Sequence, residues 1–301
     1  MESFLITFLG TGNAIPTPLR NHTGILVGIA NTKENILIDC GEGIQRQLRI
    51  ARISPTKITR ILITHWHGDH ILGMPGLLQT LAMSNYQNTL KIYGPKGTSR
   101  LMQTIKELMI DFRINLEIHE SSGGTITDEP LFKIESSSMS HGIPSLAYSI
   151  IIKDKIRLDK KKIKKLKLPN SPLLRDLQNG KDIIWNKKKI KSSSLTYFEK
   201  GKKLTFVLDT AMNENILKIA KNSDLLVCES TFSEKESSIA KEYKHLTSKD
   251  AGTIAKKSNS RSLILTHISQ RYEHNPHQIE KEARKIFKNS KIAKDFDIVI
   301  I

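Results

Sequence analysis

Residues 64–70 read Thr-His-Trp-His-Gly-Asp-His, and four of these side chains are of types that bind metal ions. Imidazole and carboxylate groups together suit zinc or a similar divalent ion, and manganese also accepts them. An open catalytic zinc site uses three protein ligands, so four candidates in one short motif exceed the needs of a single ion. The motif therefore predicts a metal centre, and two ions sharing the cluster would account for the surplus.

The spacing within the motif predicts how its side chains are presented. His65 and His67 stand two positions apart after an apolar, strand-like run, so an extended backbone would project both to the same side. Gly68 then allows a sharp turn that presents Asp69 and His70 to a neighbouring point. A lone histidine here would more often be an ordinary polar residue, whereas this crowding favours a metal site.

The remaining ligands should come from the ends of other strands, where layered α/β folds place their chemistry. His141, Asp209 and His267 each follow an apolar run or stand in its flanking turn. A ligating histidine usually donates its second N–H to a carboxylate or carbonyl, and Asp39, at the end of its own strand, is a candidate for that supporting role. The histidines that lack such a setting are expected to be structural: His22, His119, His274 and His277.

Short apolar runs alternate with helix-like segments along most of the chain. The predicted strands are 4–9, 25–29, 35–38, 60–63, 90–93, 146–152, 204–208, 224–227 and 262–265. The predicted helices are 42–51, 75–84, 98–109, 213–222, 247–257 and 276–288. Pro75 suits a first helical turn, and Thr247 with Asp250 matches a capping box. The alternation excludes an all-α and an all-β fold and predicts a layered α/β or α+β fold.

The positive charge of the chain is concentrated in one segment. The formal charge of the whole chain is +17, which favours anionic partners such as nucleic acid or a membrane surface. Residues 153–203 hold 18 Lys or Arg and 5 Asp or Glu, a local charge of +13. This composition fits either a solvated lysine-rich linker or an insertion projecting from the body, with short helices at 160–166 and 173–178.

The sequence carries no sign of a membrane segment. No apolar run approaches the ~20 residues needed to cross a bilayer, and the first twelve residues lack a basic leader or a cleavage site. We therefore expect a cytoplasmic protein. Cys40 and Cys228 each follow an apolar run and are expected to be reduced and at least partly buried. The length of 301 residues by itself fits one large domain or two small ones.

The Thr-His-x-His-x-Asp-His motif resembles that of the metallo-β-lactamase superfamily, and the blocks around it narrow the resemblance to the ribonuclease Z family. The blocks run in order along the chain: FLGTGNAIPT from Phe8, DCGEGIQRQL from Asp39, ITHWHGDHILGMPGLLQTL from Ile63, MSHGIPSLAYS from Met139, LDTA from Leu208, CESTF from Cys228, HLTS from His245 and LTHISQRY from Leu265. Three positions differ from residues common in that family, namely Trp66, Leu208 and Cys228, where leucine, glycine and histidine are usual.

The resemblance implies a four-layer αββα sandwich of the metallo-β-lactamase fold with a protruding basic arm. Residues 1–301 would form a single domain, with 153–203 as an insertion in it. Two zinc ions would lie at one edge of the sandwich. The implied ligands are His65, His67 and His141 for one ion, Asp69, His70 and His267 for the other, and Asp209 as the bridge.

The implied activity is endoribonuclease cleavage of the 3′ trailer from precursor tRNA after the discriminator nucleotide, with a 3′-hydroxyl left on the tRNA and a 5′-phosphate on the trailer. The resemblance assigns His245 as the general acid, Glu229 as the residue that orients it, and Asp69 as the acceptor of a proton from the attacking water. It also suggests that Thr247 and Arg271 contact the substrate. From the residues alone, Thr247 fits a helix cap equally well, Arg271 a surface ion pair, and His245 an exposed polar side chain.

The basic segment coincides with the flexible arm, or exosite, of short-form ribonuclease Z. LPNSPLLRDLQNGK from Leu168 resembles that arm's Pro-x-x-Pro-Leu-Leu-x-x-Leu-x-x-Gly pattern, and Lys164, Lys165, Lys167 and Arg175 are its expected phosphate contacts. Members of the family are commonly homodimers in which one subunit's arm holds the tRNA that the other cleaves, so a homodimer is expected.

Two rival functions stay open. Another metallo-β-lactamase-fold phosphodiesterase or small-molecule hydrolase would share the ligands but gives no reason for the basic segment. A non-catalytic RNA-binding protein would explain the charge but not seven intact ligand positions.

Overall fold

The chain divides into two compact units. The computed structural model describes residues 3–109 and 112–301, so the first two residues of the N-terminal stretch considered above lie outside it. The first unit, which we call the body, comprises Met1–Ile151 and Lys203–Ile301, and the second unit is Ile152–Lys202. The limits of the second unit differ by one residue at each end from the predicted insertion, 153–203.

Within the described residues, the strands of the body form two seven-stranded sheets. The first sheet has the order β18-β1-β2-β3-β4-β5-β6. Its strands are β1 (Phe4–Gly10), β2 (Gly24–Ile29), β3 (Asn35–Ile38), β4 (Arg60–Leu62), β5 (Leu90–Pro95), β6 (Leu116–Ser121) and β18 (Ile298–Ile300). The second sheet has the order β17-β16-β15-β14-β9-β8-β7. Its strands are β7 (Gly123–Asp128), β8 (Phe132–Met139), β9 (Ser145–Ile152), β14 (Lys202–Val207), β15 (Leu225–Glu229), β16 (Leu263–Thr266) and β17 (Ser290–Ile292).

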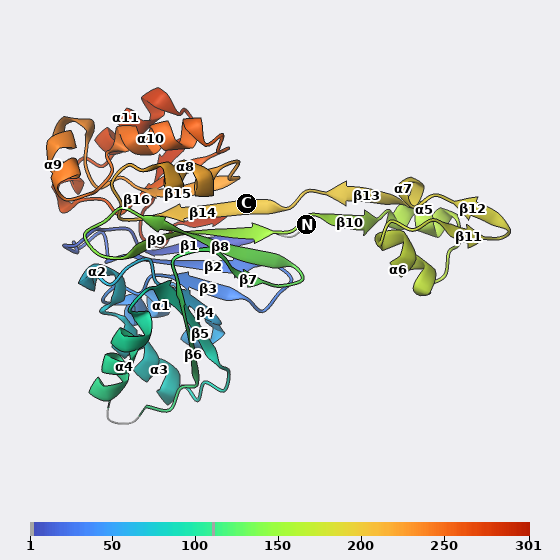
Figure 1. Cartoon of the computed structure of the whole chain (residues 1–301), viewed down its shortest axis with the longest axis horizontal. Coiled ribbons are helices and arrows are strands. Elements are labelled where there is room, and N and C mark those ends of the chain that lie inside the picture. The colour runs from blue at the N-terminus through green and yellow to red at the C-terminus, as the bar shows by residue number, and fades with distance from the viewer. Residues whose placement is uncertain (1–2, 110–111) are drawn as a thin grey trace. The chain divides into compact units, whose positions relative to one another are not determined.

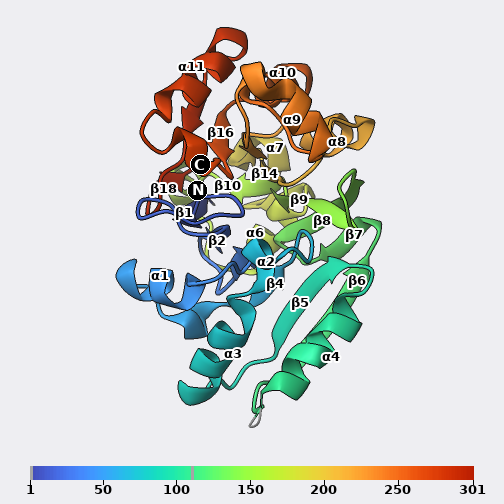
Figure 2. The same cartoon turned by 90° about the vertical axis from the view of Figure 1, so that its left-hand side faces the viewer.

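Helices cover the outer face of each sheet, which makes four layers (Figures 1 and 2). On the first sheet lie α1 (Ile44–Ile50), α3 (Met74–Met83) and α4 (Thr98–Leu108), and on the second lie α8 (Glu214–Ala220), α10 (Ser248–Lys257) and α11 (His277–Ile286). The shorter helical elements of the body are η1 (Pro55–Lys57), α2 (Gly68–Ile71), η2 (Glu234–Glu236), α9 (Ser237–Glu242) and η3 (Gln270–Tyr272). The predicted αββα sandwich is confirmed.

Alternation of side chains explains why each sheet is apolar on both faces. In β1, Phe4, Ile6 and Phe8 are fully buried and share one face, while Leu9 points to the other and packs with α1 and α3. In α10, Ala251 and Ile254 bury one helical face against the second sheet. The sheets therefore share an apolar layer between them, and each also carries a second layer under its helices.

All nine predicted strands and all six predicted helices of the body form, but the sequence prediction missed five strands. These are β6, β7, β8, β17 and β18. β17 and β18 have three residues each, too short for a period to be read, and β8 alternates its apolar side chains with serine and charge. Neighbouring strands, rather than local preference, stabilise these segments.

The second unit is packed around its own small core. It contains β10 (Lys155–Leu158), α5 (Lys160–Lys165), α6 (Pro172–Gln178), β11 (Ile183–Trp185), β12 (Lys188–Ile190), α7 (Ser192–Leu195) and β13 (Thr196–Glu199), drawn in yellow-green in Figure 1. The core residues are Ile163, Leu168, Leu177, Ile183 and Leu195. The reading of this segment as a solvated linker is therefore wrong. The two predicted helices form, and the four short strands were not predicted.

Two simpler expectations can be compared directly with the structure. Cys40 and Cys228 are free thiols and fully buried, as predicted. Among the described residues, none of the helices has the length and apolar character that a membrane crossing requires.

Candidate metal centre

Chemically active side chains gather where parallel strands end. β3 runs parallel to β4, and β14, β15 and β16 run parallel to one another, so their carboxyl ends share one edge of each sheet. Asp39 follows β3, Asp209 follows β14, Glu229 ends β15 and His267 follows β16. His65 comes shortly after β4.

Direct hydrogen bonds hold the two sheets together beside these residues. The Tyr148 hydroxyl of β9 donates to the Ile63 carbonyl oxygen at 2.7 Å, and the Leu146 N–H donates to the Thr64 carbonyl oxygen at 2.9 Å. Both contacts flank His65. Near His267, an isolated β-bridge joins Gly12, which follows β1 of the first sheet, to Ile268, which follows β16 of the second sheet. The site is therefore built across the two sheets.

A short helix gives the metal-binding motif its shape. β4 ends at Leu62, and α2 begins at Gly68, which places Asp69 and His70 in one helical turn. Gly68 is not among the glycines with positive φ, and the change of chain direction predicted at this glycine is made by the helical turn of α2. His67 caps α2 with extended backbone.

One group of ligand atoms comprises His65, His67, His141 and Asp209. His67 Nδ1 lies 3.0 Å from His65 Nε2 and 3.2 Å from His141 Nε2. Asp209 Oδ2 lies 3.6 Å from His65 Nε2 and 3.9 Å from His141 Nε2. Three imidazole nitrogens and one carboxylate oxygen thus face a common point.

The second group comprises Asp69, His70, His267 and Asp209. His70 Nε2 lies 3.2 Å from His267 Nε2, and Asp69 Oδ2 lies 3.3 Å from both of these nitrogens. Asp209 Oδ1 lies 3.4 Å from His70 Nε2 and 3.2 Å from His267 Nε2. Ligands placed ~2.0–2.1 Å from a tetrahedral ion stand about 3.3–3.4 Å apart, which matches these separations.

Hydrogen bonds behind the rings fix which nitrogen of each histidine faces the groups. His70 Nδ1 donates to Asp39 Oδ2 at 2.7 Å, and His65 Nδ1 lies 3.1 Å from Thr64 Oγ1. His267 Nδ1 lies 2.9 Å from Thr231 Oγ1, and His141 Nδ1 lies 3.2 Å from the Lys244 carbonyl oxygen. With Nδ1 engaged as the donor, Nε2 of each neutral ring presents a lone pair to its group.

Asp209 provides the test of whether these residues fit metal ions. Its side chain is 3% exposed, and Oδ1 is buried with no hydrogen-bond partner among the described residues. That oxygen faces the Nε2 atoms of His70 and His267, so three acceptors converge where only a cation satisfies them. Although burial opposes it, Asp209 and Asp39 raise the pKa of His70 well above its ordinary value, so these two carboxylates favour positive charge at that ring. The donor set fits two divalent ions that share Asp209.

A histidine and a glutamate lie beside the second group. His245 Nδ1 donates to Glu229 Oε2 at 3.0 Å, and the His245 ring stacks on His267 with centroids 5.5 Å apart. Although burial opposes it, the Glu229 carboxylate raises the pKa of His245 to about 9. Glu229 is fully buried and also accepts from the Thr210 N–H at 2.7 Å and from Thr231 Oγ1 at 2.6 Å. His245 is therefore oriented by an anchored carboxylate.

Thr247 and Arg271 make local contacts in the structure. Thr247 caps α10 in a reciprocal capping box with Asp250, and it is 3% exposed. Arg271 Nη1 lies 3.0 Å from Glu236 Oε1, and its side chain is half exposed. Both residues thus have the structural role that the residues alone allowed, and contact with a substrate stays a prediction for each.

Supporting residues were missed by the sequence prediction. Thr64 bonds both Asp39 and His65, and Thr231 links His267 to Glu229. Thr64 directly precedes His65 and Thr231 follows Glu229 by two positions, but a threonine carries no ligand signal of its own. Only its partners in space reveal the role.

The three positions that differ from common family residues lie behind the site. Cys228 and Leu208 are fully buried, and Cys228 belongs to the apolar layer under α8, α10 and α11. Trp66 packs against the layer under α3, and its Nε1 donates to Thr98 Oγ1 at 2.9 Å. The substitutions therefore fall in the packing around the ligands.

Asp39→Asn should weaken metal binding by about 10- to 100-fold while leaving the fold intact. Asp39 has φ +57°, a conformation that asparagine tolerates as well as aspartate. Asp39 accepts from the Thr64 N–H and hydroxyl and from His70, each at 2.7 Å, and an amide cannot accept all three. Competition with a chelator measures the affinity, and unchanged metal affinity would contradict the supporting role of Asp39.

Comparisons with known proteins identify relatives of this chain. A family model described as "Anti-Pycsar protein Apyc1" matches residues 4–113. The chain is 37% identical over 294 residues to a protein named Ribonuclease Z from Methanothermobacter thermautotrophicus, covering 96% of this chain and 94% of that protein. It is 36% identical over 303 residues to Ribonuclease Z from Enterococcus faecalis, covering 98% and 97%.

Solved structures share the whole fold. Human tRNase Z, short form, superposes with a TM-score of 0.70 at 25% identity, covering 98% of each chain. The metallo-beta-lactamase fold protein YhfI from Bacillus subtilis superposes with a TM-score of 0.73 at 19% identity over both full chains. The second likeness concerns the fold alone.

Proposed function

The chain belongs to the ribonuclease Z family and is a tRNA 3′-processing endoribonuclease, and from this premise we propose how its site carries out the cleavage. The substrate is precursor tRNA, cut after the discriminator nucleotide so that the tRNA keeps a 3′-hydroxyl and the trailer a 5′-phosphate. The observation that carries the proposal is Asp209, whose two oxygens face two separate groups of histidine and aspartate ligands.

The seven ligands divide between two zinc ions. His65, His67 and His141 would hold one, Asp69, His70 and His267 would hold the other, and Asp209 would be shared between them. Bound ions would supply Lewis-acid activation of water and positive charge for the scissile phosphate. Manganese also suits these donors, and elemental analysis of the purified protein distinguishes the two metals.

The chain's own residues move the protons. Asp69 accepts a proton from the attacking water, because its carboxylate lies at the edge of the second group and is 10% exposed. His245 donates a proton to the leaving 3′-oxygen, because its Nδ1 is held by Glu229 and its side chain is 15% exposed. Burial of Glu229 keeps that orientation rigid.

Incubation with a precursor tRNA that carries a 3′ trailer tests the function. Cleavage directly after the discriminator nucleotide is the expected result. Hydrolysis of small phosphodiesters without cleavage of the precursor would indicate the rival hydrolase, and binding without any hydrolysis would indicate the non-catalytic RNA-binding protein.

The second unit is proposed as the arm that grips the tRNA. Its core orders the unit, while Lys164, Lys165, Lys167 and Arg175 remain exposed. Phosphate contacts give salt-dependent affinity without reading sequence, which suits an enzyme that must accept many tRNAs. A homodimer, in which this arm serves the partner's site, and a cytoplasmic location complete the proposal. Light scattering after size-exclusion chromatography measures the oligomeric state.

Replacing residues 159–195 by Asn-Gly should reduce the affinity for precursor tRNA about 100-fold or more while leaving the metal centre intact. Leu158 pairs with Thr196 in the antiparallel β10–β13 ladder, so a two-residue turn closes this hairpin in register. The change removes the core of the second unit as a whole. Binding is measured by filter retention over a salt series.

Hydrolysis of bis(p-nitrophenyl) phosphate serves as the control for the shortened chain. This substrate is too small to need an arm, so its rate should stay within about twofold of the unaltered protein. The substitution of alanine for Lys164, Lys165, Lys167 and Arg175 in the intact unit should give part of the binding loss. If the shortened chain lost precursor-tRNA binding and bis(p-nitrophenyl) phosphate hydrolysis to the same degree, the second unit would not be a separable docking unit.

A further inference from the structure

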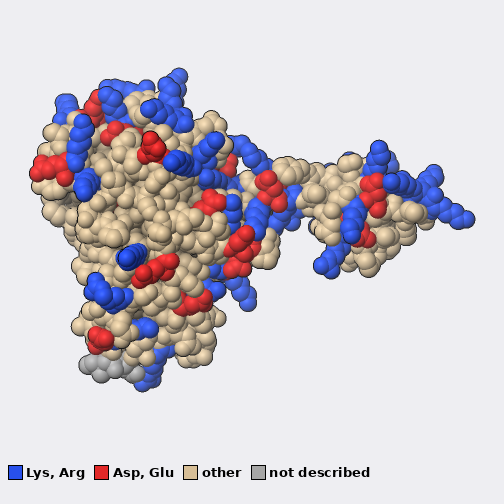
Figure 3. All heavy atoms as spheres, in the orientation of Figure 1, with Lys and Arg blue, Asp and Glu red and all other residues tan. Residues whose placement is uncertain are grey.

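Helix α11 presents a basic surface on the body that the proposed site does not use. We define the α11 surface by His277, Lys281, Arg284 and Lys285 of α11 together with Lys235 of η2, all of them exposed. On α11, residues 277, 281 and 285 recur every four positions, opposite the buried Ile279 and Ala283. In the view of Figure 3, Lys and Arg side chains gather over α10 and α11.

Two adjoining hollows give this surface its shape. One is lined by His277, Glu280, Lys281, Arg284 and Lys285, with a volume of about 460 Å³. The other is lined by Lys235, Asn275, His277, Gln278, Lys281, Glu282 and Lys285, with a volume of about 470 Å³. Shared lining residues make them parts of one depression. His277, expected to be structural, lies in both.

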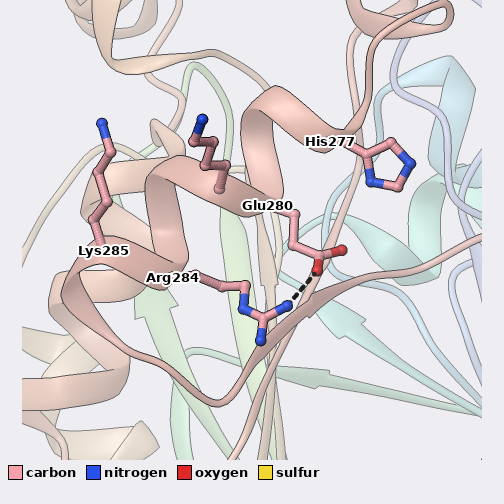
Figure 4. Close-up of a pocket in the computed structure, with 5 residues that line it drawn as sticks. His277, Glu280, Arg284 and Lys285 are labelled. Carbon is pink, nitrogen blue, oxygen red and sulfur yellow. Dashed lines mark hydrogen bonds and ion pairs between the residues drawn. The ribbon is translucent and has the colours of Figure 1, made fainter.

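The acidic groups of this surface are occupied by local partners. Glu280 pairs with Arg284 at 3.2 Å, as Figure 4 shows, and also accepts from the Ile292 N–H at 3.2 Å. Glu282 accepts from the Glu234 N–H at 2.9 Å and from the Ser248 hydroxyl. These carboxylates therefore hold the fold together at this point.

The acids of η2 each form an ion pair. Glu234 pairs with Lys249, and Glu236 pairs with Arg271. Lys235, Lys281 and Lys285, by contrast, form no ion pair within residues 3–109 and 112–301. In Figure 4 the Lys285 side chain extends away from α11. Three cations thus have no ion-pair partner among these described residues. Of the neighbouring acids, Glu280, Glu234 and Glu236 are paired with a cation, while Glu282 accepts hydrogen bonds from neutral groups, so the surface keeps a net positive charge that favours an added polyanion.

A chain of contacts connects this surface to the candidate catalytic histidine. The His245 ring lies 6.0 Å from the Phe232 ring, and Arg271 Cζ lies 5.7 Å from the same ring. Arg271 then pairs with Glu236, the neighbour of Lys235. The α11 surface therefore begins a few side chains away from the point where the substrate is proposed to be cut.

We propose that the α11 surface binds the phosphate backbone of the single-stranded 3′ trailer of the precursor. This inference rests on the proposed function. The tRNA body already has a docking element in the second unit, so the trailer is the part of the substrate that lacks a partner. Lysines bind phosphates regardless of base sequence, which suits trailers of differing sequence.

The test compares Lys235→Ala, Lys281→Ala and Lys285→Ala, made together, with a control triple of Lys33→Ala, Lys57→Ala and Lys96→Ala. The control lysines are exposed on the body, and their replacement removes the same net charge as the α11 triple does. Substrates are precursors with a trailer of about 2 nucleotides and of about 15 nucleotides, because single-stranded sites span ~4–16 nucleotides.

The α11 triple should raise KM about tenfold for the long-trailer precursor and by no more than about twofold for the short one. The slope of log affinity against log salt should fall by about 2, since each of three lost contacts contributes about 0.7 for a single strand. The control triple should leave the two substrates equally affected. Equal loss on both precursors with the α11 triple would overturn the trailer assignment and place the tRNA body there instead.

Binding of a labelled 15-nucleotide RNA, read by fluorescence anisotropy, separates this inference from the proposed function. A loss of binding in the α11 triple supports the surface even if the protein fails to cleave precursor. Normal precursor cleavage with RNA binding unchanged in the α11 triple overturns the surface and leaves the proposed function standing. Bis(p-nitrophenyl) phosphate hydrolysis and thermal unfolding should match the unaltered protein, since all three lysines are exposed.

Discussion

Replacement of Asp209 by alanine is expected to release both metal ions and to abolish precursor cleavage. Asp209 is the one described residue common to both ligand groups, and its two oxygens face opposite groups. Loss of this carboxylate would remove one donor from each group and would leave the three histidines of the first group without a carboxylate. Each group would then keep only three of its four donors.

Metal content and activity must be measured together for this variant. Asp69→Ala and His141→Ala are the matched controls, because each removes a donor from one group only. Elemental analysis should give about two ions in the unaltered protein, about one in each control and close to none in Asp209→Ala. Circular dichroism checks that the variant is folded. If folded Asp209→Ala retained both ions, the proposed bridging role of Asp209 would be wrong.

His245→Ala is expected to slow single-turnover cleavage of precursor tRNA about 10²- to 10⁴-fold with metal content unchanged. The rate should fall because the leaving ribose 3′-oxygen must be protonated as it departs. His245 is held by Glu229 at 3.0 Å in an orientation suited to that transfer. His245 is not one of the seven proposed ligands that make up the two groups, so its removal should not release metal.

A change of leaving group gives the sharper test of this role. p-Nitrophenolate departs without protonation, so His245→Ala should hydrolyse bis(p-nitrophenyl) phosphate within a few fold of the unaltered protein. Glu229→Gln should share this selective defect in milder form, although Thr231 also couples Glu229 to His267. If both substrates slow equally, or if precursor cleavage stays within a few fold, His245 is not the general acid.

The layered fold was predictable because its central strands and amphipathic helices carry strong periodic patterns. β1, β14 and α10 follow directly from apolar residues at the spacing of a strand or a helix. β17 and β18 did not, because three residues contain no period, and pairing with a neighbouring strand decides their conformation.

The second unit shows the same division. The charge of +13 over residues 153–203 and the two helices of the unit were visible in the sequence. Its core was not, because Ile163 stands among lysines and Leu177 and Leu195 each stand between polar residues, and only the folded chain brings them together. The basic composition of this segment therefore did not predict that it folds around a core.

The sequence by itself determined which side chains could bind metal, since three histidines and one aspartate within seven residues are a donor set typical of metal sites. The tertiary structure alone decided how these side chains divide between the two ligand groups. Residues as distant as His70 and His267 meet only in the folded chain, and Asp209, which follows β14, is shared by both groups. Ring orientation, set by Thr64 and Thr231, is likewise a property of the fold, because a hydrogen bond across space leaves no mark in a local pattern.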